Sequence, residues 1–121
     1  MALTVGLPVI TISTGVAPQS ATWTDDSIGD AESISFFLNA ATTAPGILIS
    51  AALTTQSTAT FVSILRPVDS FSSSILAYTN VTSSGIYTLW PATFRQLKFT
   101  STGLVTAAGG IPVIGAKMIT V

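Results

Sequence analysis

Carboxylates are the side chains of this sequence whose type and spacing come closest to a hydrolytic site. Two carboxyl groups serve as acid and base in glycosidases, and clustered carboxylate oxygens bind calcium. Four of the five acidic residues fall within the eight positions from 25 to 32, but without the order of ligands and glycine of a calcium loop. We therefore favour a solvated polar loop over either alternative. The acidic residues are Asp25, Asp26, Asp30 and Glu32, with Asp69 apart from them.

Other familiar catalytic chemistry is missing. The chain has no histidine and no cysteine, which excludes nucleophilic triads that need imidazole and zinc sites built on His or Cys. The pair Gly109-Gly110 is followed by Ile-Pro rather than Lys-Ser or Lys-Thr, so it does not match a phosphate-binding loop. We expect a protein that is not an enzyme and has no cofactor, no metal and no small-molecule substrate.

The charge content is unusually low. Only 7% of the residues are charged, the net charge is −1 and the mean hydropathy is +0.68, whereas ordinary soluble domains have roughly 25% charged residues. Such a surface suits either a membrane protein or a protein largely covered by partners. The best apolar run, residues 46–53, is far shorter than a spanning helix, and the N-terminus lacks the basic region of a secretory signal. We expect no membrane and, because Arg66, Arg95, Lys98 and Lys117 do not cluster, no nucleic acid.

The elements that must position these residues are strands. Thr occurs 19 times and Ser 15 times; Thr, Val and Ile suit pleated, half-buried surfaces, and Ser, Gly and Pro suit the turns between them. The pattern predicts an all-β fold, an antiparallel β-sandwich of jelly-roll type with about eight strands, as one domain over residues 1–121. The predicted strands are 3–12, 33–39, 47–53, 60–65, 75–79, 86–90, 97–101 and 111–121.

Both ends of the chain carry local signals. The alternation of the first strand slips by one residue between Val9 and Ile10, which predicts a bulge, and Pro8 removes a ladder donor. We therefore expect residues 1–20 to form an edge strand or an extended arm. Residues 13–21 are expected to be a loop. In the last strand, Gly115 suggests a second bulge.

Six residues are candidates for an assembly interface. Phe37 is the best of them, because it shares its strand phase with Ser33, Ser35 and Asn39. The others are charged: residues 1–60 contain no Lys or Arg, so the acidic segment must find its partners later in the chain. We expect Asp25, Asp26 and Asp30 to meet Arg95 or Lys98, either within the fold or across a subunit boundary; simple solvation of these loops is an equally good alternative.

A family resemblance accompanies these features. The run IYTLWPATFRQLKFTS at 86–101 resembles a pattern of small virion-associated proteins of tailed phages, in which a strand leads through a proline and a corner phenylalanine to an apolar-Lys-apolar strand. Residues 107–121 and 60–63 are also similar to those proteins. The sequence departs from the pattern at Trp90, where the family has aspartate, and at 66–69, where an Asp-Gly turn is expected. The resemblance implies a jelly-roll-like subunit on a phage particle, on its head.

Three functions follow as expectations. The first is a decoration or cement protein on the outer surface of a phage capsid, with the major capsid protein and copies of itself, as a homotrimer, for partners. The second is a tail, neck or fibre component of the virion. The third is a carbohydrate-binding β-sandwich, which requires an exposed Trp23 or Trp90 beside a polar groove.

Overall fold

The alternating segments of the sequence form β-strands in the computed structural model, which describes residues 1–38, 46–56, 60–63, 65–67, 75–77, 85–89 and 94–121. Within these ranges, one short helix, α1 (Asp25–Ile28), interrupts the strands. The strands are β1 (Ala2–Gly6), β2 (Ile10–Ile12), β3 (Ser20–Trp23), β4 (Ser33–Leu38), β5 (Ile47–Ala52), β6 (Val62–Ser63), β7 (Leu65–Pro67), β8 (Ile75–Ala77), β9 (Gly85–Leu89), β10 (Gln96–Ser101) and β11 (Ile111–Thr120). Three residues named above, Asn39, Asp69 and Trp90, lie outside the described residues.

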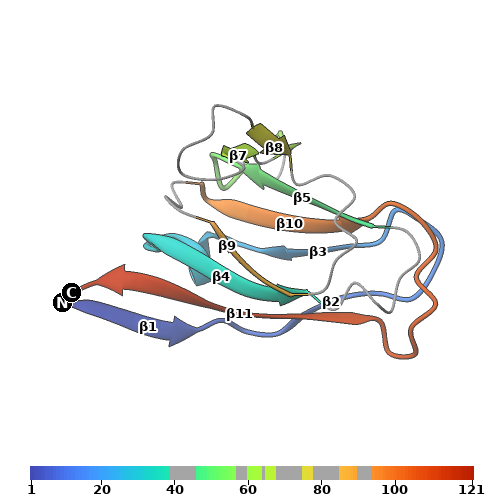
Figure 1. Cartoon of the computed structure of the whole chain (residues 1–121), viewed down its shortest axis with the longest axis horizontal. Helices are drawn as coiled ribbons and strands as arrows, with labels where there is room; N and C mark the ends of the chain where they lie inside the picture. Colours follow the sequence, from blue (N-terminus) through green and yellow to red (C-terminus); the bar gives the residue numbers. More distant parts are fainter. Residues whose placement is uncertain (39–45, 57–59, 64, 68–74, 78–84, 90–93) are drawn as a thin grey trace.

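The strands form two antiparallel sheets and a small ribbon (Figure 1). One sheet has the order β1-β11-β4-β9, with β2 pairing farther along β11; the other has the order β3-β10-β5-β6, and β7 pairs with β8. From β2 to β5 the chain changes sheet at every step, stays in one sheet from β5 to β6, and alternates again through β9, β10 and β11. This is the strand order of a jelly roll. The predicted fold class is confirmed, and over the described residues the two sheets contain eight strands when β1 and β2 are counted as one interrupted strand.

The predicted slip in the first strand is confirmed by burial. The chain leaves the ladder after β1 and rejoins it at β2, so that Leu7 and Ile12, which differ in phase, both face the core. Between the two strands, the carbonyl oxygen of Pro8 accepts a hydrogen bond of 2.8 Å from the indole Nε1 of Trp23. An aromatic side chain of the other sheet thereby holds the interruption in place.

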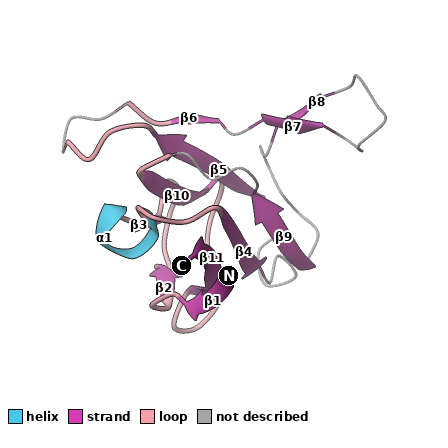
Figure 2. Cartoon of the chain, turned by 90° about the vertical axis from the view of Figure 1, so that its left-hand side faces the viewer, coloured by secondary structure: helices cyan, strands magenta, loops and turns pink. Residues whose placement is uncertain are grey.

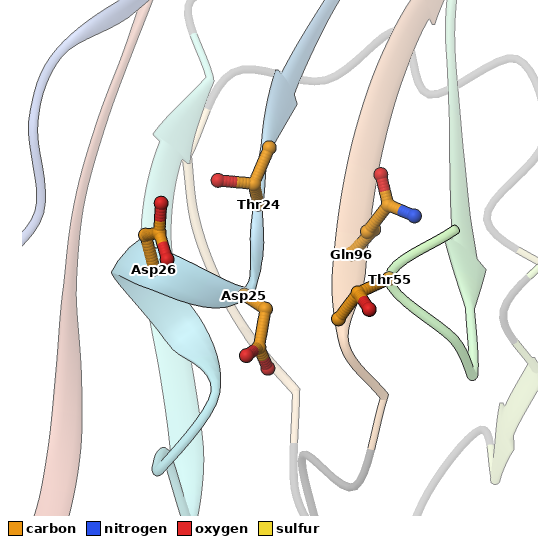
Figure 3. Close-up of a pocket in the computed structure, with 5 residues that line it drawn as sticks. All are labelled: Thr24, Asp25, Asp26, Thr55 and Gln96. Carbon is orange, nitrogen blue, oxygen red and sulfur yellow. The ribbon is translucent and has the colours of Figure 1, made fainter. Parts of the chain in front are cut away.

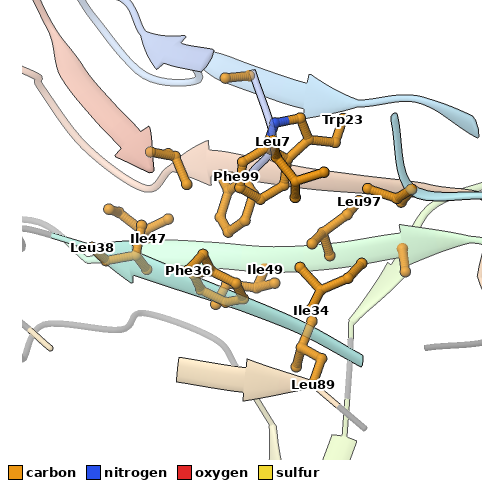
Figure 4. Close-up of a cluster of buried hydrophobic side chains, with 14 of the residues drawn as sticks. Leu7, Trp23, Ile34, Phe36, Leu38, Ile47, Ile49, Leu89, Leu97 and Phe99 are labelled. Atoms are coloured by element: carbon orange, nitrogen blue, oxygen red, sulfur yellow. The ribbon is translucent and has the colours of Figure 1, made fainter. Parts of the chain in front are cut away.

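The core lies between the two sheets and contains an aromatic cluster (Figure 4). Phe99 of β10 packs edge-on against Phe36 of the opposite sheet, with ring centroids 4.9 Å apart, and against its neighbour Trp23, 5.4 Å away. All three are at most 1% exposed. Fully burying a side chain of this size stabilises a fold by roughly 1.5–3 kcal/mol, so this cluster is a main connection between the sheets. Aliphatic residues complete it: Ile12, Ile34, Leu38, Ile47, Ile49, Leu97, Ile111 and Val113.

Two local predictions are wrong. The expected loop 13–21 ends early, because Ser20 already begins β3, which pairs with β10 and buries Ala21. The expected bulge at Gly115 is absent, since the pairing of β11 with β4 continues without interruption from Ile114 to Met118.

Figure 2 shows the molecule from the side, with α1 beside β3 and the two chain ends close together. The helix is held to the core by Ile28, which is fully buried.

Candidate functional site

A row of exposed apolar side chains crosses the β1-β11-β4-β9 sheet on the side away from the core. Phe37 of β4 lies between Ile86 of β9 and Ile114 of β11, and each pair is directly opposite in the strand register. Directly opposite residues project from the same face of a sheet. The exposed fractions are 40% for Phe37, 76% for Ile86 and 52% for Ile114. We call these three residues the Phe37 row.

Among the described residues, those directly beside the Phe37 row are uncharged. Met118, 40% exposed, continues the row along β11 on the same face. Beside Phe37, the hydroxyls of Ser35 and Thr88 share a hydrogen bond of 2.9 Å. The charged residue of β11, Lys117, is paired with the buried Ile34 and therefore projects from the opposite side of the sheet. A partner that covers this face would meet apolar groups and hydroxyls that already have a partner.

The outer face of the other sheet has a different character. Lys98 lies at its centre, directly opposite Thr22 on one side and Ser50 on the other, with Thr100 next along the same strand face. The ammonium group of Lys98 lies 4.2 Å from the ring centroid of Phe61, a distance suited to a cation–π contact. The centre of this outer face is thus more polar than the Phe37 row, although Leu48 and Ala52 of β5 share the face. Lys98 points outward as its strand phase predicts, but its described partner is an aromatic ring and not an acid.

The structure brings Arg95 to the acidic segment within the same chain. Arg95 precedes β10 and donates hydrogen bonds from Nη1 to Asp25 Oδ1, 3.2 Å away, and to the carbonyl oxygen of Gly29, 2.6 Å away. Both acceptors belong to α1 and the residue that follows it. Arg95 therefore holds this helical turn against the end of the four-stranded sheet. The sequence allowed this pairing within the fold or across a subunit boundary, and in the described structure it occurs within the fold.

A second ion pair joins Asp30 to Lys117, which the sequence did not single out. Lys117 Nζ lies 2.5 Å from Asp30 Oδ1; the lysine side chain is 12% exposed and the aspartate side chain 66%. This hydrogen bond from Lys117 lowers the pKa of Asp30 below its ordinary value of 3.8. Nearby, the hydroxyl of Thr120 donates to Glu32. The sequence does mark Lys117 as unusual, because this lysine shares its strand phase with Ile111 and Val113, which are buried.

The first acids of this segment line a shallow hollow of about 290 Å³ (Figure 3). Asp25 and Asp26 occupy successive positions at the start of α1, and Figure 3 shows their carboxylates pointing in different directions. The Asp25 carboxylate is bound to Arg95. Within the described ranges, no group of three or more metal-ligating side chains comes together. The hollow is lined by Thr24, Asp25, Asp26, Thr55 and Gln96.

Trp23 is unavailable as a sugar-binding platform. The carbohydrate-binding hypothesis requires an exposed indole, whereas Trp23 is 1% exposed and packs on Phe99. Its polar N–H, which could have contacted a sugar hydroxyl, is already bonded to Pro8. The other tryptophan considered, Trp90, lies outside the described residues.

The described part of the chain thus combines an exposed apolar row on one outer face, a more polar centre on the other and an acidic segment held by ion pairs. Among the helices that the structure describes, none is long and apolar enough to cross a membrane. Comparisons of the chain with protein-family models, curated proteins and solved structures found no match.

Proposed function

We propose that this protein is a non-enzymatic structural subunit that attaches to the outer surface of a tailed-phage capsid as a decoration or cement protein. The observation that carries the proposal is the Phe37 row, an exposed apolar strip on one outer face of the sandwich. In this arrangement the row faces the shell and the polar sheet around Lys98 faces solvent. The major capsid protein is the partner.

The row has the properties of a binding surface. Apolar side chains gathered on one surface patch, as opposed to scattered singly, mark interaction sites. An aromatic residue at the centre of such a patch is the usual anchor of an interface. Because the hydroxyls of Ser35 and Thr88 share a hydrogen bond, each keeps one partner when the face is covered. Association therefore gains from apolar burial at a reduced desolvation cost for these two hydroxyls.

The low charge of the chain also supports attachment to a large partner. Two of the acids are bound to cations of the same chain, Asp25 to Arg95 and Asp30 to Lys117. These pairs stabilise α1 and the end of β11, and they leave the Phe37 row free of charge. Shape and apolar contact, more than ion pairing across the boundary, then determine the orientation on the shell. The resemblance of residues 86–101 to phage virion proteins is the reason for choosing a phage head as that shell.

The first experiment counts copies of this chain in purified particles by quantitative mass spectrometry. Abundance close to that of the major shell protein is expected for a protein of the head surface. A handful of copies would move the protein to the tail, neck or fibre, the alternative location within a virion. Complete absence from particles would contradict the proposal.

The second experiment tests the face itself. Particles stripped of this protein are mixed with purified variants, and binding is measured by co-sedimentation. Phe37→Ser and Ile114→Ser are expected to weaken binding by roughly tenfold or more each, because each removes an apolar contact of the interface. Leu104→Ser is the matched control: Leu104 is 53% exposed, as Ile114 is 52%, but it lies in the loop before β11. Equal binding of all three variants would contradict the assignment of the face.

A further inference from the structure

The backbone of β1 offers hydrogen-bonding groups along one edge of the sheet. Met1 and Val121 exchange both backbone hydrogen bonds, at 3.0 and 2.9 Å, and the Leu7 amide donates to the Gly115 carbonyl at 2.9 Å. In an antiparallel ladder every second residue bonds to the neighbouring strand. Leu3 and Val5 therefore direct their amides and carbonyls toward β11, and the intervening residues of β1 direct theirs outward. Those outward residues are Ala2, Thr4 and Gly6.

Within β1 itself, from Ala2 to Gly6, this edge lacks the features that usually protect an edge strand; Pro8 and the interruption before β2 come after it. Natural edges carry charges, prolines or bulges that prevent pairing with another chain. β1 has the sequence ALTVG, its pairing with β11 is regular, and β1 is the last strand in the sheet order. Figure 1 shows it as the lowest strand, with the two chain ends together at one end of it. Leu3 is also 45% exposed, which is unusual for a leucine on the core side of a sheet.

We infer that β1 pairs with β1 of a second copy of this chain, antiparallel and about a two-fold axis at Thr4. In this register Thr4 lies opposite Thr4 of the second copy, and Ala2 lies opposite Gly6. These are the residues whose amides and carbonyls point outward, so each pair exchanges two hydrogen bonds. Leu3 then lies opposite Val5, and two partly exposed aliphatic side chains cover each other. A second copy fits this edge because the outward groups are symmetric about Thr4.

Charge does not oppose the pairing. The one charged side chain of β1 and β11 is Lys117, and it is neutralised by Asp30 of its own chain. A two-fold axis perpendicular to the sheet also places the outer face of both copies on the same side of the joined sheet. The two Phe37 rows then belong to one continuous sheet, and both can face the same surface. This last consequence rests on the proposed function, whereas the pairing itself does not.

The test measures the mass of the isolated protein by sedimentation over a range of concentrations. The expected species has twice the chain mass of 12.4 kDa. Thr4→Pro should raise the dimer dissociation constant by roughly tenfold or more, because it removes two central donors across the axis. It removes no hydrogen bond to β11, since the Thr4 amide points outward, and proline is tolerated at such edge positions. Thr4→Val keeps the amide and should remain dimeric.

A crosslinking variant keeps the inference testable even if Thr4→Pro does not fold. Directly opposite Cα atoms in a hydrogen-bonded pair lie about 5.5 Å apart, within the range that a disulfide spans. The chain has no cysteine, so any disulfide of oxidised Thr4→Cys joins two copies through position 4. Thr11→Cys, exposed in β2, controls for random collisions. A monomeric or trimeric wild type, or equal crosslinking of both variants, would overturn the inference. A confirmed dimer that does not bind particles would contradict the proposed function alone.

Discussion

The indole of Trp23 occupies the space that a side chain at Gly115 would fill. A Cβ atom built on Gly115 would lie 2.6 Å from Trp23 Cη2 and 2.9 Å from the carbonyl oxygen of Ser35. Real Cβ atoms do not approach other atoms so closely, so either the ring or the backbone must move to admit one. Glycine is therefore required by contact between the two sheets, and no bulge in β11 is needed to explain it.

Gly115→Ala should destabilise the protein by about 1–3 kcal/mol, the usual cost of forcing extra atoms into a packed core. Urea unfolding followed by circular dichroism measures the change. Gly85→Ala is the matched control, because no atom lies within 4 Å of a Cβ built there. Its free energy of unfolding should stay within about 0.5 kcal/mol of wild type. Equal stability of the two variants would contradict the contact.

Trp23→Phe should reveal the same contact from the other side. Alone, it removes the Nε1 donor and leaves the Pro8 carbonyl without that bond, at a cost of about 1–3 kcal/mol. It also removes Cη2, the atom that opposes a side chain at position 115. Combined with Gly115→Ala, it should therefore destabilise by less than the sum of the two single changes, with a coupling of about 0.5–3 kcal/mol. Additive effects in this double-mutant cycle would argue against direct packing.

Much of the fold follows from local sequence, and the exceptions depend on contacts distant in the chain. Ile34, Phe36 and Leu38 share one phase of their strand, and serines occupy two positions of the other phase, so the pattern predicts which side is buried. The strand β3 was missed because Ser20 and Ala21 have weak strand preference, and its position depends on pairing with β10. Gly115 was misinterpreted because its reason lies in Trp23, ninety-two positions earlier in the chain.

The candidate site was predictable only in part for the same reason. The exposed position of Phe37 follows from the serines that share its strand phase. Its neighbours Ile86 and Ile114 could not be assigned to it, because their alignment depends on the register of three strands. Charge alone indicated that the acids need later cations. It could not select Lys117 for Asp30, since the fold decides which cation is close.

Arg95→Ala should lower the free energy of unfolding by roughly 0.2–1 kcal/mol, because the Arg95 and Asp25 side chains are 48% and 38% exposed and water screens their attraction. The difference from wild type should shrink when unfolding is repeated at high salt. Arg95→Lys keeps the charge, but its ammonium is more strongly hydrated and sits on a shorter side chain than Nη1 of arginine, so it should restore only part of the loss. If Arg95→Glu changed particle binding and left α1 intact, Arg95 would also belong to the interface.

Asp30→Asn should reduce stability near neutral pH and not in acid. The hydrogen bond from Lys117 lowers the folded-state pKa of Asp30 below 3.8, so the ionised carboxylate favours the folded state. Its contribution is complete above that value and is lost as the pH falls through the lower folded-state pKa. Thermal unfolding of wild type and Asp30→Asn should therefore differ at neutral pH and converge in acid. Lys117→Met, which keeps the buried stem, should converge with wild type over the same range; a difference independent of pH would contradict the pairing.

The adjacent residues Phe36 and Phe37 have different roles: Phe36 stabilises the core, and Phe37 is available to a partner. Phe36 is 1% exposed and packs on Phe99 and Tyr87, whereas Phe37 is 40% exposed on the outer face. Phe36→Ala should cost about 3–5 kcal/mol, the usual cost of removing a buried aromatic ring. Phe37→Ala should cost much less, because its ring is partly in water already, and the variant should be more soluble than wild type at high concentration, since it exposes less apolar surface. Parallel urea unfolding and solubility measurements on the two variants test both statements. A large stability loss in Phe37→Ala, similar to that in Phe36→Ala, would mean that the ring is part of the core and not available to a partner.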